Sequence, residues 1–372
     1  MRIVIAPDSF KGSLTSVEVA GALAAGWHEA RPDDEILLAP LADGGEGTLV
    51  AIAAAGGWSW ETVRAADPIG RPVMARWLRS ADGARAVVEL AEASGLSRLT
   101  SMERDPLGAS TLGTGEVLRA VIDAGIGAIT LGIGGSATTD GGAGILTALG
   151  AHFGADAINL DGLDARLAGV DLRIACDVTN PLLGPTGAAA TYGPQKGATP
   201  GDVAVLDERL AAYADRLLAA TSRDERLTPG AGAAGGTAFG LLSIADRFNS
   251  VTLVPGVEVV MDETGLRDKV AAADLVITGE GRIDAQTAFG KTALGVAQLA
   301  RAAGVRCIAV AGGVEAAGED VLSGLGAITV SVSEAPMSLE SAMAAGTDPV
   351  QRCGRRLARL MSFSFRMDTT PG

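Results

Sequence analysis

Short apolar segments alternate with helical patterns at both ends of this chain. The predicted strands span residues 3–6, 36–41, 275–278, 307–311 and 327–332. The predicted helices span residues 16–30, 48–55, 292–303 and 349–361. Alternating strands and helices of these lengths predict parallel strands that are joined by right-handed crossover helices.

The pattern changes after Gly57. Three short strand patterns, at residues 60–65, 73–78 and 86–90, are separated by turn-forming residues and predict an antiparallel meander. The predicted fold is therefore α/β with two domains. A doubly wound parallel-sheet domain, Rossmann- or flavodoxin-like, is formed by residues 1–60 and 265–372, and a mixed α/β domain is inserted at residues 61–264.

Composition and charge narrow the function. A formal net charge of −14 argues against a nucleic-acid partner, because phosphate backbones require a basic face. Three widely spaced cysteines fit a reducing compartment, and two histidines make a zinc site or a histidine-based triad improbable. Without a signal-peptide pattern or an apolar run long enough for a membrane span, we expect a cytoplasmic protein.

A polar loop containing Asp8, Ser9 and Lys11 follows the first strand. The next helix begins with a capping box, in which Thr15 and Glu18 are the paired residues. The loop therefore lies where a strand ends and a helix begins, which is where open α/β sheets bind ligands and where helix N–H groups favour anions. This placement indicates chemistry on a charged small molecule.

A second such loop contains Asp43 and Glu46 among three glycines and follows the second strand. Two carboxylates in a glycine-rich loop could bind Mg²⁺, which prefers oxygen ligands. The alternative is a turn followed by an acidic first turn of a helix, which the helix dipole also favours.

Residues 132–142 form another glycine-rich loop, with five glycines. Gly134, Gly135, Ser136 and Thr138 offer backbone N–H and hydroxyl groups that could hold phosphate, and Asp140 follows them. The loop also matches a dinucleotide fingerprint, but the acidic residue that should close the next strand is missing. We therefore expect phosphate binding here, not a dinucleotide.

Four further segments carry polar residues in turn-rich or strand-end positions. Glu280, Arg282 and Asp284 follow a strand, and the alternative is that the arginine forms only a structural ion pair with these acids. The sequence before Lys291 lacks the first glycine of a P-loop, so we reject that motif but expect Lys291 to meet an anion.

Asp177 with Asn180, and Lys196, lie in the other two segments. Lysine and arginine, glycine N–H groups and carboxylates are together the groups that phosphoryl transfer needs.

These loops resemble those of the bacterial class I glycerate kinases. The likeness runs in order from residue 1 to about residue 350, and the motifs that carry it lie at residues 6–12, 40–48, 132–142, 176–182, 192–197 and 278–284. The resemblance implies phosphorylation of D-glycerate that depends on ATP and Mg²⁺, with a cleft between two domains. It implies 2-phosphoglycerate as the product, with 3-phosphoglycerate as the alternative.

With this resemblance, each candidate residue receives an expected role. Asp8 is the first choice of general base and Asp177 the second, and Lys11 and Arg282 complete the catalytic group. The expected substrate-binding residues are Ser9, Asn180 and Lys196. The expected nucleotide-binding residues are Gly134, Gly135, Ser136, Thr138, Asp140 and Lys291. The expected Mg²⁺ ligands are Asp43, Glu46 and Glu280.

Two other functions stay open at this point. A nicotinamide-dependent dehydrogenase could use the 132–142 loop, and a non-catalytic sugar-acid sensor could bind the same ligand. The dehydrogenase would lack the ribose-binding acid and an obvious proton donor, and the loop carboxylates and the absence of a DNA-binding segment argue against the sensor. The sequence leaves open whether the chain forms a homodimer.

Overall fold

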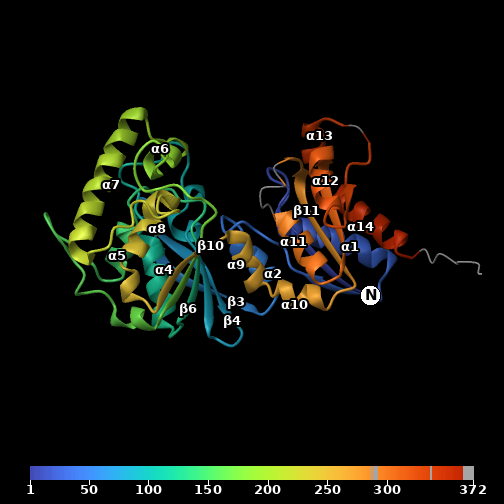
Figure 1. Ribbon diagram of the computed structural model, residues 1–372, viewed down its shortest axis with the longest axis horizontal. Coiled ribbons are helices and arrows are strands. Elements are labelled where there is room, and N and C mark those ends of the chain that lie inside the picture. Colours follow the sequence, from blue (N-terminus) through green and yellow to red (C-terminus); the bar gives the residue numbers. More distant parts are fainter. Residues whose placement is uncertain (286, 288–291, 336, 363–372) are drawn as a thin grey trace, which may run out of the picture. The chain divides into compact units, whose positions relative to one another are not determined.

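The computed structural model describes residues 1–285, 287, 292–335 and 337–362. It divides into two compact units (Figure 1). The first contains Met1–Ala42, Val50–Gly56 and Val260–Gly372, and the second contains Asp43–Leu49 and Gly57–Val259. The predicted domain limits stay predictions, but the contacts of residues 43–49 place them with the second unit, whereas the sequence pattern suggested the first.

The first unit is built on a five-stranded parallel sheet with the order β13-β12-β11-β1-β2. Its strands are β1 (Arg2–Pro7), β2 (Glu35–Leu38), β11 (Leu275–Ile283), β12 (Arg306–Val314) and β13 (Ala327–Ser331). After β1 the chain moves to one side of the sheet, and after β11 it moves to the other. The carboxyl ends of β1 and β11 therefore form a topological switch point, where such sheets bind ligands.

Helices cover this sheet. They are α1 (Ser16–Ala30), α2 (Thr48–Ala54), α9 (Gly256–Glu263), α10 (Leu266–Ala271), α11 (Thr292–Ala302), α12 (Ala316–Ser323), α13 (Leu339–Ala344) and α14 (Asp348–Leu360), with the limits between the units inside α2 and α9. The predicted capping box of α1 is present, with Thr15 and Glu18 each accepting the other's backbone N–H. Ile3 and Ile5 of β1 pack in one apolar cluster with residues of α1 and α14.

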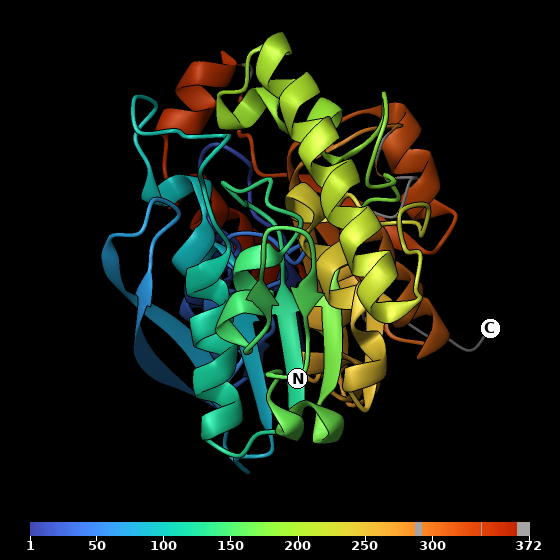
Figure 2. The ribbon, with the colours of Figure 1, turned by 90° about the vertical axis from the view of Figure 1, so that its left-hand side faces the viewer.

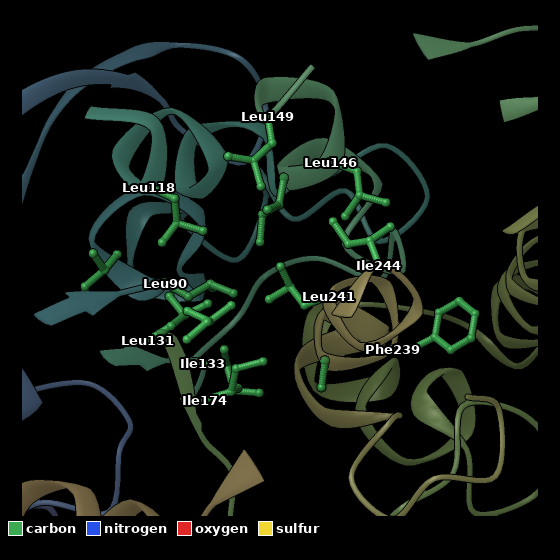
Figure 3. Packing of buried hydrophobic residues seen from close by; sticks show 14 of the residues in the cluster. Leu90, Leu118, Leu131, Ile133, Leu146, Leu149, Ile174, Phe239, Leu241 and Ile244 are labelled. Carbon is green, nitrogen blue, oxygen red and sulfur yellow. The ribbon is translucent and has the colours of Figure 1, made fainter. Parts of the chain in front are cut away.

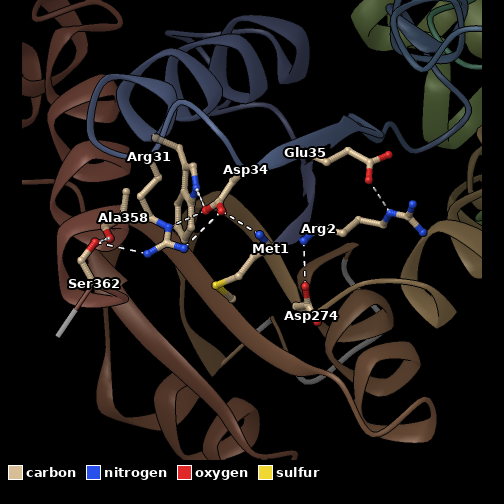
Figure 4. A network of polar contacts seen from close by, with 9 residues as sticks. Met1, Arg2, Arg31, Asp34, Glu35, Asp274, Ala358 and Ser362 are labelled. Carbon is tan, nitrogen blue, oxygen red and sulfur yellow. Dashed lines mark hydrogen bonds and ion pairs between the residues drawn. The ribbon is translucent and has the colours of Figure 1, made fainter. Parts of the chain in front are cut away.

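The start of β1 is fixed by a polar network (Figure 4). Asp34 accepts hydrogen bonds from the Met1 amino group at 2.7 Å, from Trp27 Nε1 at 3.0 Å and from Arg31. The Arg31 guanidinium, with these other donors, holds the pKa of Asp34 far below its usual range. The network holds β1 in register, and β1 leads directly to Asp8.

The second unit contains a six-stranded mixed sheet with the order β10-β9-β6-β5-β4-β3 and a two-stranded ribbon, β7-β8. Its strands are β3 (Trp58–Ala66), β4 (Pro72–Ser80), β5 (Arg85–Glu89), β6 (Ala128–Gly132), β7 (His152–Phe153), β8 (Ile158–Asn159), β9 (Asp171–Ala175) and β10 (Ser250–Val254). β3, β4 and β5 pair antiparallel, so the predicted meander is confirmed. From β5 to β10 the neighbouring strands are parallel.

Figure 2 faces this unit and shows its helices in front of the strands. The helices are α3 (Ala91–Ser94), α4 (Leu112–Asp123), α5 (Ala143–Ala148), α6 (Ala188–Tyr192), α7 (Pro200–Thr221) and α8 (Ala233–Ser243), with 3₁₀ turns η1 (Leu96–Arg98), η2 (Ala165–Gly169), η3 (Pro194–Lys196) and η4 (Ala245–Arg247). Figure 3 shows the core between them, where Leu131 and Ile174 of the strands share a cluster with Leu118, Leu146 and Phe239 of the helices. The predicted two-domain α/β fold class is confirmed.

Candidate active site

The parallel strands of the second unit all end at one edge of the sheet. β5 ends at Glu89, β6 at Gly132, β9 at Ala175 and β10 at Val254. The loops that follow β6 and β9 contain several of the polar candidates from the sequence, among them Ser136, Thr138 and Asp177. This edge is where an open parallel sheet binds its ligand.

Two glycine-rich loops contact each other at this edge. A Cβ atom added at Gly134 would lie 2.4 Å from the Cα of Gly45, and one added at Gly132 would lie 2.7 Å from the carbonyl oxygen of Gly44. A Cβ at Gly44 would in turn lie 2.7 Å from the Cβ of Ala175. Glycine is required here because one backbone approaches another. The Asp43–Leu49 segment therefore packs against the start of the 132–142 loop.

The first of these loops presents two carboxylates. Asp43 and Glu46 are exposed, and Asp43 Oδ1 accepts the N–H of Gly45 at 3.3 Å. Asp177 Oδ1 accepts the N–H of Gly256 at 2.8 Å. Partial desolvation raises the pKa of Asp177 and the charge of Asp43 raises it further, while the Gly256 N–H opposes both. The structure thus brings Asp43 near Asp177.

Exposed carboxylate oxygens of this kind fit Mg²⁺, which usually takes one or two protein carboxylates and completes its shell with water and phosphate. No cluster of three or more His, Cys, Asp or Glu side chains arranged for a metal occurs among the described residues. Of the predicted ligands, Asp43 and Glu46 belong to the second unit and Glu280 to the first.

Glu89, which the sequence analysis did not select, supports the same loop. Its side chain is 4% exposed, and its two oxygens accept the N–H groups of Gly47 at 3.0 Å and Leu49 at 3.2 Å. Burial raises the pKa of Glu89 to about 7, against the effect of the two N–H donors. A single acid at the end of an otherwise apolar strand pattern, residues 86–90, was the signal in the sequence.

The 132–142 loop is supported by Lys196. The Lys196 side chain is 1% exposed, and its Nζ donates to Ser136 Oγ at 2.9 Å and to the carbonyl oxygen of Thr138 at 2.5 Å. Burial lowers the pKa of Lys196 to about 7, and the nearby charge of Asp140 opposes this shift. The structure therefore places Lys196 beneath the loop, and the predicted contact with substrate stays untested.

Ser136 and Thr138 are buried, Gly134 is half-buried, and Gly135 is exposed with a φ of 73°. Within the described part of the chain, the buried hydroxyl groups of Thr138 and Thr139 have no hydrogen-bond partner. An unpaired buried hydroxyl is costly, so it is a natural donor for a ligand oxygen. This part of the loop fits a phosphate group.

Asp140 ends the loop in an anchoring position. Its carboxylate accepts hydrogen bonds from Thr111 N and Thr111 Oγ1, both at 2.8 Å, and from the N–H groups of Gly142 and Gly144. These contacts tie the loop to the beginnings of α4 and α5. The nucleotide-binding role predicted for Asp140 stays a prediction, and its contacts give it a structural role as well.

Asn180 joins two segments that the sequence analysis treated separately. Its Oδ1 accepts the hydroxyl of Tyr192 at 2.7 Å, and its Nδ2 donates to the carbonyl oxygen of Thr186 at 2.8 Å. The segments that contain Asp177 and Lys196 are thereby held together.

In the first unit, Asp8 lies at the switch point between β1 and β11. Its backbone N–H donates to Gly279 at 2.7 Å, and its carboxylate accepts the N–H of Ser9 at 2.6 Å and the hydroxyl of Thr292 at 2.7 Å. Thr292 begins α11, so the Asp8 carboxylate lies at the positive end of that helix. Glu280 is 7% exposed and accepts the Thr287 hydroxyl at 2.9 Å.

Two of the predicted cationic residues of the first unit, Lys11 and Arg282, are at the surface. Lys11 is exposed. Arg282 is 66% exposed along its side chain, forms an ion pair with Glu315 and lies 3.7 Å from Asp284, and the hydrogen bond to Glu315 raises its pKa. The ion-pair alternative for Arg282 is therefore present in the structure. Lys291 lies outside the described residues.

The fold and these two strand edges define an α/β enzyme with glycine loops and carboxylates at the carboxyl ends of parallel strands. The glycerate kinase family model matches residues 3–362. The chain is 41% identical to the glycerate kinase of Halalkalibacterium halodurans, over 97% of this chain and 98% of that protein. It is 39% identical to the glycerate 2-kinase of Escherichia coli, over 98% and 99%.

A solved structure from Salmonella typhimurium LT2, described as a glycerate kinase 2, matches with a TM-score of 0.83 and 41% identity, over 97% of this chain and 98% of that one. The chain belongs to the glycerate kinase family. The predicted family and enzyme class, a glycerate kinase and thus a phosphotransferase with an alcohol acceptor, are confirmed, and a kinase of this family uses a nucleotide and a small-molecule substrate. Among the described residues, none of the helices is both long and apolar enough to span a bilayer.

Proposed function

We propose that this enzyme transfers the γ-phosphoryl group of ATP, in the presence of Mg²⁺, to the C2 hydroxyl of D-glycerate and forms 2-phosphoglycerate. The observation that carries the nucleotide part is the 132–142 loop, with its supporting lysine and the unpaired Thr138 hydroxyl. The name of the Escherichia coli relative, a glycerate 2-kinase, supports the C2 position. The alternative product is 3-phosphoglycerate.

In this proposal the nucleotide phosphates lie on Gly134, Gly135, Ser136 and Thr138. Backbone N–H groups and hydroxyls there stabilise the charge that spreads over the phosphoryl oxygens during transfer. Asp43, Glu46 and Glu280 would hold Mg²⁺, which neutralises phosphate charge when bound. The exposed carboxylates of Asp43 and Glu46 fit that task.

Ser9, Lys11, Arg282 and Asn180 would engage the glycerate carboxylate or the moving phosphoryl group, since charged donors form strong hydrogen bonds to such oxygens. Asp8 would accept the proton of the acceptor hydroxyl. Asp177 is the second candidate for this base, and its raised pKa brings it nearer to the range in which a general base is effective.

The first experiment is ³¹P NMR of the purified protein with ATP, Mg²⁺ and D-glycerate. A new phosphomonoester signal split into a doublet by one proton would show transfer to C2, and a triplet would show transfer to C3. A signal with another hydroxy acid alone would correct the substrate. Consumption of no hydroxy acid at all would overturn the proposed function.

The general base can be tested with Asp8→Asn and Asp177→Asn. We expect Asp8→Asn to lower kcat by about 10²–10⁴-fold, the usual contribution of a general base, while ATP affinity stays near that of the wild type. Asp156→Asn, at an exposed loop position of the second unit, is the control. If Asp8→Asn keeps its turnover and Asp177→Asn loses it, Asp177 is the base.

A further inference from the structure

The buried carboxylate of Glu89 holds the loop that carries Asp43 and Glu46. Both of its oxygens accept backbone N–H groups of that loop, from Gly47 and Leu49. In the parallel ladder Glu89 is paired with Gly132, the residue that begins the other glycine loop. One side chain therefore stands at the point where the two loops meet.

Burying this carboxylate lowers the stability of the fold. A carboxylate at 4% exposure loses most of its hydration, and the charges of Glu92 and Glu46 oppose its ionisation further. A fold that needed only packing at this position would be served by an apolar side chain. What the carboxylate supplies is two acceptors in fixed positions for a loop that has few side chains of its own.

The geometry of the loop shows what those acceptors fix. Gly44 and Gly47 have φ values of 79° and 95°, so glycine freedom lets the backbone turn sharply on both sides of Glu46. Fixing the N–H groups of Gly47 and Leu49 therefore fixes the direction in which Glu46 leaves the backbone. The Thr48 hydroxyl, which donates to Gly45 at 2.7 Å, closes the turn from within.

We propose that Glu89 is a positioning residue for phosphoryl transfer: by holding the N–H groups of Gly47 and Leu49, it keeps the Asp43–Leu49 loop in the conformation in which its carboxylates can serve the reaction. This inference rests on the proposed function for the role of Asp43 and Glu46. The anchoring of the loop by Glu89 rests on the hydrogen bonds alone.

The test compares Glu89→Gln with a matched control, Glu116→Gln. Glutamine keeps the shape of Glu89 but offers one acceptor and brings an NH₂ group against a backbone N–H. Glu116 on α4 is also a carboxylate that accepts a backbone N–H, from Ala66 at 2.7 Å, and it contacts β3, not the loop. Both variants are measured for kcat, for KM of Mg²⁺ and glycerate, for thermal unfolding and for amide exchange.

We expect Glu89→Gln to lower kcat at least about tenfold, with a higher Mg²⁺ requirement and little change in KM for glycerate. The amides of Gly47 and Leu49 should exchange faster than in the wild type. Glu116→Gln should change unfolding but keep kcat within about twofold. Glu89→Asp, which retains the charge one methylene shorter, should recover part of the lost kcat, and it replaces Glu89→Gln if that variant does not fold.

A Glu89→Gln enzyme with wild-type kcat and Mg²⁺ requirement would overturn the proposal, even if its loop amides exchanged faster. Equal losses of kcat in the Glu89 and Glu116 variants would do the same, since they would reduce Glu89 to a general stabiliser. If the wild type itself transfers no phosphoryl group, the proposed function fails. The exchange of Gly47 and Leu49 then decides separately whether Glu89 anchors the loop.

Discussion

The two glycine-rich loops of the second unit are held in opposite ways. The Asp43–Leu49 loop gives its N–H groups to a buried acid, Glu89, whereas the 132–142 loop receives hydrogen bonds from a buried base, Lys196. Glycine-rich loops have few side chains to fix their backbone, and in both loops an ionisable residue from elsewhere in the chain contributes to this support. A loop backbone can therefore be held by an acid or by a base, because each peptide group offers both an N–H donor and a carbonyl acceptor.

The same comparison predicts opposite contributions to stability as the pH changes. The pKa of Glu89 is raised from 4.5 to about 7, so the folded state keeps a proton that the unfolded state loses, and stability falls as pH rises from 4.5 to 7. The pKa of Lys196 is lowered from 10.5 to about 7, so burial of its ammonium destabilises the folded state fully below pH 7. This destabilisation decreases as the pH rises from 7 toward 10.5.

Among the substitutions that test how the two loops are supported, the largest expected effect comes from removing the lysine. Lys196→Met leaves Ser136 Oγ and the Thr138 carbonyl without their buried donor, so the loop should shift and kcat/KM should fall about 100-fold, equivalent to about 2.7 kcal/mol. Steady-state kinetics with ATP and glycerate measures this loss. Thermal unfolding at pH 7 should show no comparable loss, because the substitution also removes a buried charge.

Lys269→Met is the matched control. Lys269 also donates to two carbonyl oxygens, of Leu38 at 3.2 Å and Ala55 at 2.9 Å, but it belongs to the first unit, whereas both loops belong to the second. Its kcat/KM should stay within about twofold of the wild type. Equal kinetic losses in the two variants would mean that Lys196 matters to the fold and not to the loop.

A smaller effect is expected from pushing the two loops apart. In Gly134→Ala the new Cβ would meet the Cα of Gly45 at 2.4 Å, so backbone must move, and we expect kcat to fall about tenfold. Gly169→Ala is the control, since a Cβ there would meet no atom within 4 Å. Wild-type turnover in Gly134→Ala would show that the contact between the loops can relax without harm to the reaction.

Much of the fold could be predicted from the sequence because its signals are local. Alternation of apolar strands and helices gave the parallel sheet of the first unit, the turn pattern gave the meander, and Thr15 with Glu18 gave the start of α1. Each of these depends on residues within one or two elements. The family resemblance followed from short loop motifs and from their order along the chain, and both can be seen in the sequence without knowledge of the fold.

The support of the loops could not be predicted, because it depends on contacts between residues far apart in the chain. Lys196 is 60 residues from Ser136, and Glu89 is 42 residues from Gly47. Asp140 in a phosphate-type loop indicated ligand binding, but its partner Thr111 lies 29 residues earlier. The glycines indicated a ligand near the backbone, and for Gly132 and Gly134 the near neighbour is another loop.

The smallest expected effect is on the pH dependence of nucleotide binding. This effect should depend on Lys196 and not on Glu89. With a phosphate on the 132–142 loop, the added negative charge would raise the pKa of Lys196 from about 7, so binding would take up a proton. Asp140 already acts in this direction. Affinity should therefore fall about threefold as pH rises from 7 to 8, beyond the dependence that ATP itself causes.

Isothermal titration calorimetry in buffers of different ionisation enthalpy measures that proton uptake directly. The wild type and Glu89→Gln should take up a similar fraction of a proton, because the acid supports the other loop, and Lys196→Met should take up less. The same proton uptake in the wild type and in Lys196→Met would contradict a phosphate on this loop. A phosphate bound there would raise the pKa of the buried Lys196 ammonium, and only the wild type has that group.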